Sequence, residues 1–117
     1  MEQGLQISWR GVPPSPALEA DIREKAAKLE QFFNPIISCR VVVEAPQTHR
    51  RHGKLYRLRI DVHVPGHTIN VSHDPSADHS HEDMYVTIRD AFDAARRQLQ
   101  DHARFVHGDI RTSSTNR

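Results

Sequence analysis

The sequence has only one cysteine, Cys39, so the chain cannot form an internal disulfide, and nothing in its composition indicates an oxidising compartment. No apolar run approaches the roughly 18 residues that a membrane-spanning helix needs. The start of the chain lacks the basic and apolar regions of a signal peptide. We therefore expect a cytoplasmic protein with no membrane partner. An apolar content of 37% in 117 residues is sufficient for one globular domain.

The motifs of the common catalytic sites are also lacking. There is no glycine-rich phosphate loop, no G-x-S-x-G elbow and no H-E-x-x-H zinc motif. Cys39 alternates with valines along a predicted strand, which favours a small core residue over a nucleophile. We predict that the protein is not an enzyme and uses no cofactor.

Histidine, in contrast, is abundant, with nine residues. His73, His79 and His81 lie among four acidic residues, and imidazole and carboxylate ligands suit zinc or nickel. Because this loop offers no cysteine and no fixed element, we interpret it as a polar loop before a helix and predict no metal site. A histidine-based metal-binding stress protein remains the alternative.

Hydrophobic periodicity predicts four strands and two helices. The strands are expected in the stretches LQISWRG, ISCRVVVEAP, YRLRIDVHVPG and HTINVSH, where apolar residues alternate with polar ones. A first helix should begin after Ser15 as cap, with Pro16 at its first position, and continue to about Phe33 before Asn34-Pro35 ends it. Its apolar stripe consists of Leu18, Ile22, Ala26, Leu29 and Phe33.

The second helix should follow a capping box, Ser80 to Asp83, and fray near Phe105 or His107. Tyr85 and Ala91 are expected to flank its inward stripe. That stripe consists of Met84, Ile88, Phe92, Ala95 and Leu99.

The predicted element order is β-α-β-β-β-α, which indicates an α+β sandwich. The first two strands should be parallel through a right-handed crossover, and the next two should continue as antiparallel hairpins. Each helix has one apolar stripe and each strand one apolar face, so both helices should pack on one face of a four-stranded mixed sheet. We predict one domain over residues 1–107 and a disordered tail over 108–117.

Basic residues are concentrated in particular segments although the formal net charge is only +1. The densest run, THRRHGK, lies between the second and third strands and is either a solvated hairpin tip or a basic finger that reaches phosphate. On the helices, Lys25 and Lys28 are three residues apart, and four arginines form two rows of period seven that can border a shared groove. The candidate RNA-binding residues are Lys25, Lys28, Arg50, Arg51, Lys54, Arg57, Arg59, Arg89, Arg96, Arg97 and Arg104.

Two amphipathic helices with ordinary solvated charge would show a similar pattern. In that interpretation Asp90, Asp93 and Asp101 would simply pair with the arginines of the second helix. Arg57 and Arg59, together with Arg40, instead project from the open face of the sheet and form a second candidate surface.

The motifs KLEQFF, VVVE and EDMYVTIRDAFDAARRQL resemble the ribosome hibernation promoting factor and protein Y family, also called ribosome-associated translation inhibitors or sigma-54 modulation proteins. The likeness extends from about Leu5 to Leu99. It implies a double-stranded-RNA-binding-like fold that docks on the small ribosomal subunit, in the mRNA and tRNA channel near the decoding centre. Such proteins silence and preserve ribosomes in stationary phase or stress.

At the positions that match the family, Lys25, Lys28 and Arg97 correspond to its basic residues, and Tyr85 corresponds to an aromatic residue beside the interface. The chain departs from the family pattern in three ways: Asp90, Asp93 and Asp101 dilute the basic residues of its second helix, its histidine-rich loop is longer, and its THRRHGK run is more basic. The dimerising C-terminal domain of long members has no counterpart, so we expect a monomer off the ribosome or part of something longer. One family name also leaves open a regulator that binds a transcription factor.

Overall fold

The structure is a computed structural model that describes residues 4–45, 56–73 and 84–115. Its elements follow the predicted β-α-β-β-β-α order. They are β1 (Leu5–Arg10), α1 (Pro16–Phe32), β2 (Ser38–Glu44), β3 (Arg57–Val64), β4 (His67–His73) and α2 (Met84–Thr115). No described helix is both long enough and apolar enough to cross a membrane.

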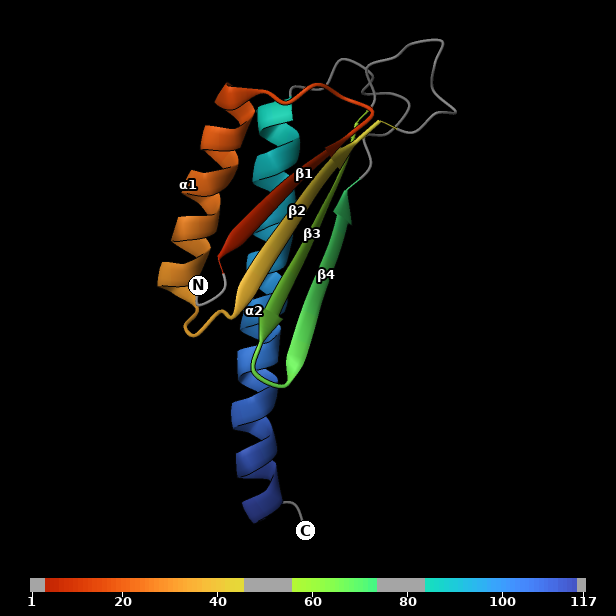
Figure 1. The fold of residues 1–117 in the computed structure, drawn as a ribbon. Coiled ribbons are helices and arrows are strands. Elements are labelled where there is room, and N and C mark those ends of the chain that lie inside the picture. Colours follow the sequence, from red (N-terminus) through yellow and green to blue (C-terminus); the bar gives the residue numbers. More distant parts are fainter. Residues whose placement is uncertain (1–3, 46–55, 74–83, 116–117) are drawn as a thin grey trace.

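The four strands form one sheet in the order β1-β2-β3-β4. β1 pairs with β2 in parallel, with Leu5 opposite Cys39, whereas β2–β3 and β3–β4 are antiparallel. Figure 1 shows both helices on the same side of this sheet. The predicted α+β class, mixed sheet and one-sided helix layer are therefore confirmed.

The start of α1 is fixed by the residues that the sequence indicated. The Ser15 hydroxyl accepts a hydrogen bond from the Leu18 N–H at 3.2 Å, and Pro16 takes the first helical position, where its missing N–H costs nothing. At the other end, the Phe33 N–H still donates to the Leu29 carbonyl at 2.9 Å. The helix therefore stops just before Asn34-Pro35, as predicted.

One hydrophobic core lies between the sheet and the helices. On β3, Leu58, Ile60, Val62 and Val64 are all buried, because every second residue of a strand faces the same layer. The helices contribute residues at helical spacing to the same cluster. Their buried members are Ile22, Ala26 and Leu29 on α1 and Ile88, Ala91, Phe92, Ala95 and Leu99 on α2.

Two predictions about α2 need correction. The helix continues to Thr115 rather than ending near Phe105 or His107. The division into a domain over residues 1–107 and a tail over 108–117 stays a prediction. No proline interrupts this polar stretch, and its one glycine, Gly108, costs a helix only about 1 kcal/mol. Tyr85, expected to flank the core, is 44% exposed, whereas Ala91 is fully buried. The capping box over 80–83 lies outside the described residues.

The thiol of Cys39 is buried on the core side of β2, as the alternation predicted. Burial, with a smaller contribution from the negative charge of Asp61, raises the pKa of Cys39 from 9.0 to about 12. Between these values the unfolded chain loses the thiol proton while the folded protein keeps it, so stability falls as the pH rises.

This linkage predicts that the free energy of unfolding decreases above pH 9 by up to about 1.4 kcal/mol per pH unit from Cys39 alone. Urea unfolding at pH 7, 9 and 10 measures it. The variant Cys39→Ala is the control, because every other titrating group is retained and only the thiol contribution disappears. A pH dependence identical in the two proteins would contradict the expectation.

Candidate nucleic-acid interface

A groove with a volume of about 340 Å³ lies between α1 and α2, and we call it the helix groove. Apolar side chains of both helices form part of its lining, and four basic side chains complete it together with one acid. The lining residues are Lys25, Lys28, Leu29, Phe32, Arg89, Phe92, Asp93 and Arg96.

The helical repeat explains why these basic residues meet. On α1, Ala26 and Leu29 belong to the stripe that faces the core. Lys25 and Lys28 each precede one of these residues, so both lie on the same flank of that stripe. On α2, Arg89 and Arg96 are seven residues apart, which is close to two full turns and returns both to one flank. The two helices pack against each other, and these flanks form the walls of the groove.

Arg96 is held on an aromatic ring. Its guanidinium carbon lies 5.7 Å from the centre of the Phe32 ring, within the range of a cation–π contact. Phe32 is 43% exposed, and Arg96 forms no ion pair with any residue that the structure describes. The planar fork of its guanidinium suits the bidentate hydrogen bonds that phosphate accepts.

The other basic residues of the helix groove have acidic neighbours. Lys28 lies 3.8 Å from Glu24, and Arg89 lies 3.1 Å from Asp90. These side chains are largely exposed, and such pairs contribute little to stability and exchange readily for a stronger anion. Four cations therefore face one lining carboxylate, and the helix groove is a cationic site that favours polyanions.

The ion pair of Lys25 is more buried than those of Lys28 and Arg89. Its ammonium nitrogen lies 2.9 Å from Oδ1 of Asp21, and both side chains are largely buried. The Oδ2 atom of Asp21 has no hydrogen-bond partner among the described residues. Lys25 therefore also compensates a carboxylate within the protein.

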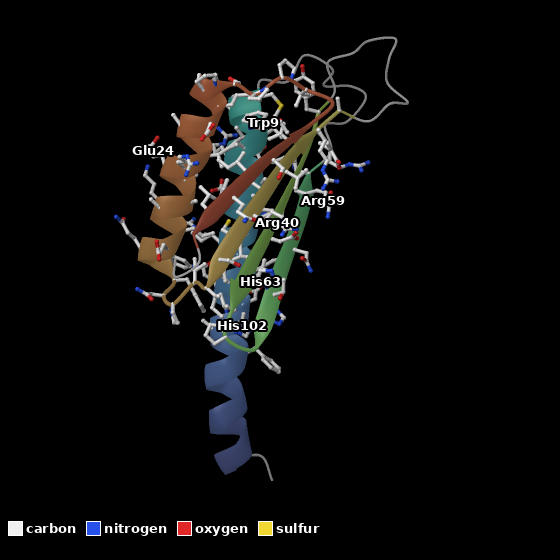
Figure 2. All side chains as sticks on the ribbon, in the orientation of Figure 1. Trp9, Glu24, Arg40, Arg59, His63 and His102 are labelled. Carbon is white, nitrogen blue, oxygen red and sulfur yellow. The ribbon has the colours of Figure 1, made fainter. Side chains whose placement is uncertain are left out.

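The open side of the sheet carries a second group of charges, which we call the sheet face. Arg57 pairs with Glu44 at 3.5 Å, whereas Arg10, Arg40 and Arg59 form no ion pair with described residues. Figure 2 labels Arg40, Arg59 and His63 along β2 and β3. In register across the strands, the sheet face consists of Gln6, Ser8, Arg10, Ser38, Arg40, Val42, Glu44, Arg57, Arg59, Asp61, His63, Thr68, Asn70 and Ser72.

The structure separates the eleven predicted RNA-binding residues into several places. Four of them, Lys25, Lys28, Arg89 and Arg96, line the helix groove, and Arg57 and Arg59 lie on the sheet face. Arg97 and Arg104 are exposed on α2 but do not line the groove, and Arg104 contacts Asp101 at 2.6 Å. Arg50, Arg51 and Lys54 lie outside the described residues, so the basic finger and the solvated tip both stay open. The RNA-binding role of all eleven remains a prediction.

Leu29, Phe32 and Phe92 are the apolar residues of the groove, which charge patterns alone did not reveal. A signal existed at Phe32-Phe33, because adjacent residues of a helix differ by about 100° and cannot both face the core. Phe33 packs against the core and Phe32 lines the groove. Of the histidine cluster, only His73 belongs to the described residues, and these contain no group of three or more ligand-type side chains placed to hold a metal ion.

The fold and the helix groove together define a class: an α+β domain with a cationic groove on its helical layer. Residues 5–106 match the family described as Sigma 54 modulation protein / S30EA ribosomal protein. The chain belongs to this family, which confirms the resemblance seen in its motifs. No curated protein matches the chain with significant sequence similarity.

Two solved structures are similar in fold. The N-terminal domain of Protein Y from Thermus thermophilus superposes with a TM-score of 0.63 at 20% sequence identity, covering 83% of this chain and 94% of that one. A ribosomal subunit interface protein from Coxiella burnetii gives a TM-score of 0.64 at 23% identity, covering 86% and 97%. Both chains are covered almost entirely, so the four-stranded sheet with two helices is the shared architecture.

Proposed function

We propose that the protein binds the small ribosomal subunit through ribosomal RNA, in the mRNA and tRNA channel near the decoding centre, and silences ribosomes in stationary phase or stress. The chain belongs to a family whose description includes a ribosomal protein, and this membership supports the function. The similarity to a ribosomal subunit interface protein supports it as well. The single observation that carries it is the helix groove, which is lined by four basic side chains and two phenylalanines.

The groove suits an RNA backbone rather than a particular base sequence. Its cations sit on two rigid helices, so they present a fixed spacing of charge to phosphates, and contacts of this kind position a protein by backbone and shape. No reaction follows from such contacts. Inhibition is steric, because one rigid domain and the mRNA–tRNA pair cannot occupy the same channel together.

Sucrose-gradient co-sedimentation with separated subunits tests the proposal. The protein should migrate with small subunits at low salt and detach as salt rises, because each phosphate contact releases counterions. The large subunit is the internal control and should carry little protein. A protein that stays at the top of the gradient with small subunits at low salt would show the proposal to be wrong.

A regulator that binds a transcription factor is the second candidate, and the family description itself favours it by naming sigma-54 modulation. The sheet face, with its mixture of four arginines and two carboxylates, suits a polar protein interface. A partner captured by the protein should then survive nuclease treatment. Loss of every partner with nuclease favours the ribosomal function instead.

A further inference from the structure

The sheet face is hollowed at the end where β1 and β2 begin and β3 ends. This hollow, which we call the sheet pocket, has a volume of about 590 Å³. It lies at one end of the sheet and shares no lining residue with the helix groove. Its polar lining includes Gln6, Ser38, Arg40, His63, His67 and Thr68.

Strand register brings these polar groups together. Gln6 of β1 is the direct partner of Arg40 on β2, and His63 of β3 lies between Ser38 on one side and Thr68 on the other. Side chains of direct partners start about 5 Å apart and point to the same face. The Thr68 hydroxyl lies 3.1 Å from Nδ1 of His63, which links two of the lining groups. Donors from all four strands therefore converge on one hollow.

The charge of the sheet pocket favours an anion. Arg40 is its arginine, and this guanidinium has no ion pair within the described part of the chain. Asp61 is the cross-strand partner of Arg40, yet it does not line the pocket, and no other described carboxylate does. A guanidinium without an ion pair, with hydroxyl and amide groups beside it in the lining, is suited to binding phosphate.

The dimensions indicate more than an inorganic ion. A volume of about 590 Å³ falls within the range of small-ligand sites, and phosphate alone would leave most of it empty. His67 also lines the pocket, and its imidazole stacks on His102 of α2 with ring centres 4.5 Å apart and planes only 8° apart. Figure 2 shows His102 beside the β3–β4 turn. This stack fixes the position of His67 at the end of the sheet where the pocket lies.

We propose that the sheet pocket binds a nucleotide by its phosphate group, with the Arg40 guanidinium holding the phosphate and Ser38, Thr68 and Gln6 donating further hydrogen bonds. The base lies toward His67. This function does not depend on ribosome binding, because no residue of the helix groove takes part.

Titration of the ¹⁵N-labelled protein with AMP, followed by NMR, tests the proposal. AMP should shift the amide signals of Ser38, Arg40, His63 and Thr68 and saturate at millimolar concentrations or below. Adenosine, which lacks the phosphate, should bind at least about tenfold more weakly. A short single-stranded RNA, titrated in parallel, distinguishes a free nucleotide from a backbone phosphate as the source of the bound group.

The variant Arg40→Gln should weaken AMP binding by about tenfold or more, whereas Arg59→Gln should leave it within about twofold. Arg59 is the matched control, because it lies on the same face, has no ion pair with described residues and does not line the pocket. Unchanged signals outside the sheet pocket show that each variant folds. If the RNA shifts the signals, AMP does not, and Arg40→Gln removes those shifts, the pocket is a phosphate site that an RNA backbone occupies. No shift with either ligand, or equal losses in the two variants, overturns the proposal.

Discussion

Replacement of Lys28, Arg89 and Arg96 by glutamine should weaken binding to the small ribosomal subunit on the order of 100-fold near 0.1 M salt, because three charge-assisted contacts of about 1 kcal/mol each are lost. The slope of log affinity against log salt should fall by about 2–3 units, since fewer counterions are released. Lys25 is left intact because it compensates the largely buried Asp21 carboxylate. Quantitative co-sedimentation across a salt series measures both effects.

The chain offers a closely matched control for this triple variant. Arg10, Arg23 and Arg104 lie outside the helix groove, and their replacement by glutamine removes the same charge. Because Arg104 is itself a predicted RNA-binding residue, this control also tests whether it contributes away from the groove. Each set has two residues in surface pairs and one without an ion pair to described residues, namely Arg96 in the groove and Arg10 in the control. The control variant should lose less than about tenfold. Equal losses would mean that general charge, and not the groove, drives binding.

The second large effect concerns the core. Ile60→Ala should lower the free energy of unfolding by about 2–5 kcal/mol and Tm by roughly 10–20 °C. Ile60 is fully buried in the central strand β3, between Val41 on β2 and Val71 on β4, so neighbouring side chains cannot easily collapse into the space. Urea unfolding followed by circular dichroism measures the loss, which should appear as a lower midpoint concentration of urea with an unchanged m-value.

Val42→Ala is the comparison for this core variant. Val42 is only 3% exposed, yet it lies on the sheet face, where Ser8 and Arg59 are its direct neighbours, and it is not part of the core cluster. Flexible surface side chains can close over the missing methyl groups, so a cost of about 1 kcal/mol is expected. A cost equal to that of Ile60→Ala would show that both faces of the sheet are packed alike.

The fold was largely predictable because its local rules agree with one another. Three local patterns predict the same fold, and the structure agrees with each. They are the Ser15-Pro16 start of α1, the alternation along β3 and the spacing of apolar residues on α2. The end of α2 was not predictable in this way. A polar segment without proline carries no stop signal, and composition alone does not distinguish a projecting helix from a tail.

The candidate site was predictable only as far as helical geometry extends. Spacing placed Lys25, Lys28, Arg89 and Arg96 on facing flanks, and the structure brings them to one groove. Spacing could not separate Arg97 from Arg96, because the distance between two helices decides which of two adjacent arginines reaches the gap. The sheet pocket was missed, since it depends on the register of four strands that are distant in sequence.

The contact between Arg96 and Phe32 has a consequence for the entropy of binding. A free arginine has about 2 kcal/mol of rotamer entropy to lose when a ligand immobilises it. The Arg96 side chain is already restrained over the Phe32 ring, at 5.7 Å, before any anion arrives, so part of that loss has occurred during folding. Its exposed neighbour Arg97 has no such aromatic contact among the described residues. For the same charge, Arg96 should therefore contribute more affinity than Arg97, because the ring beneath it already restrains the side chain.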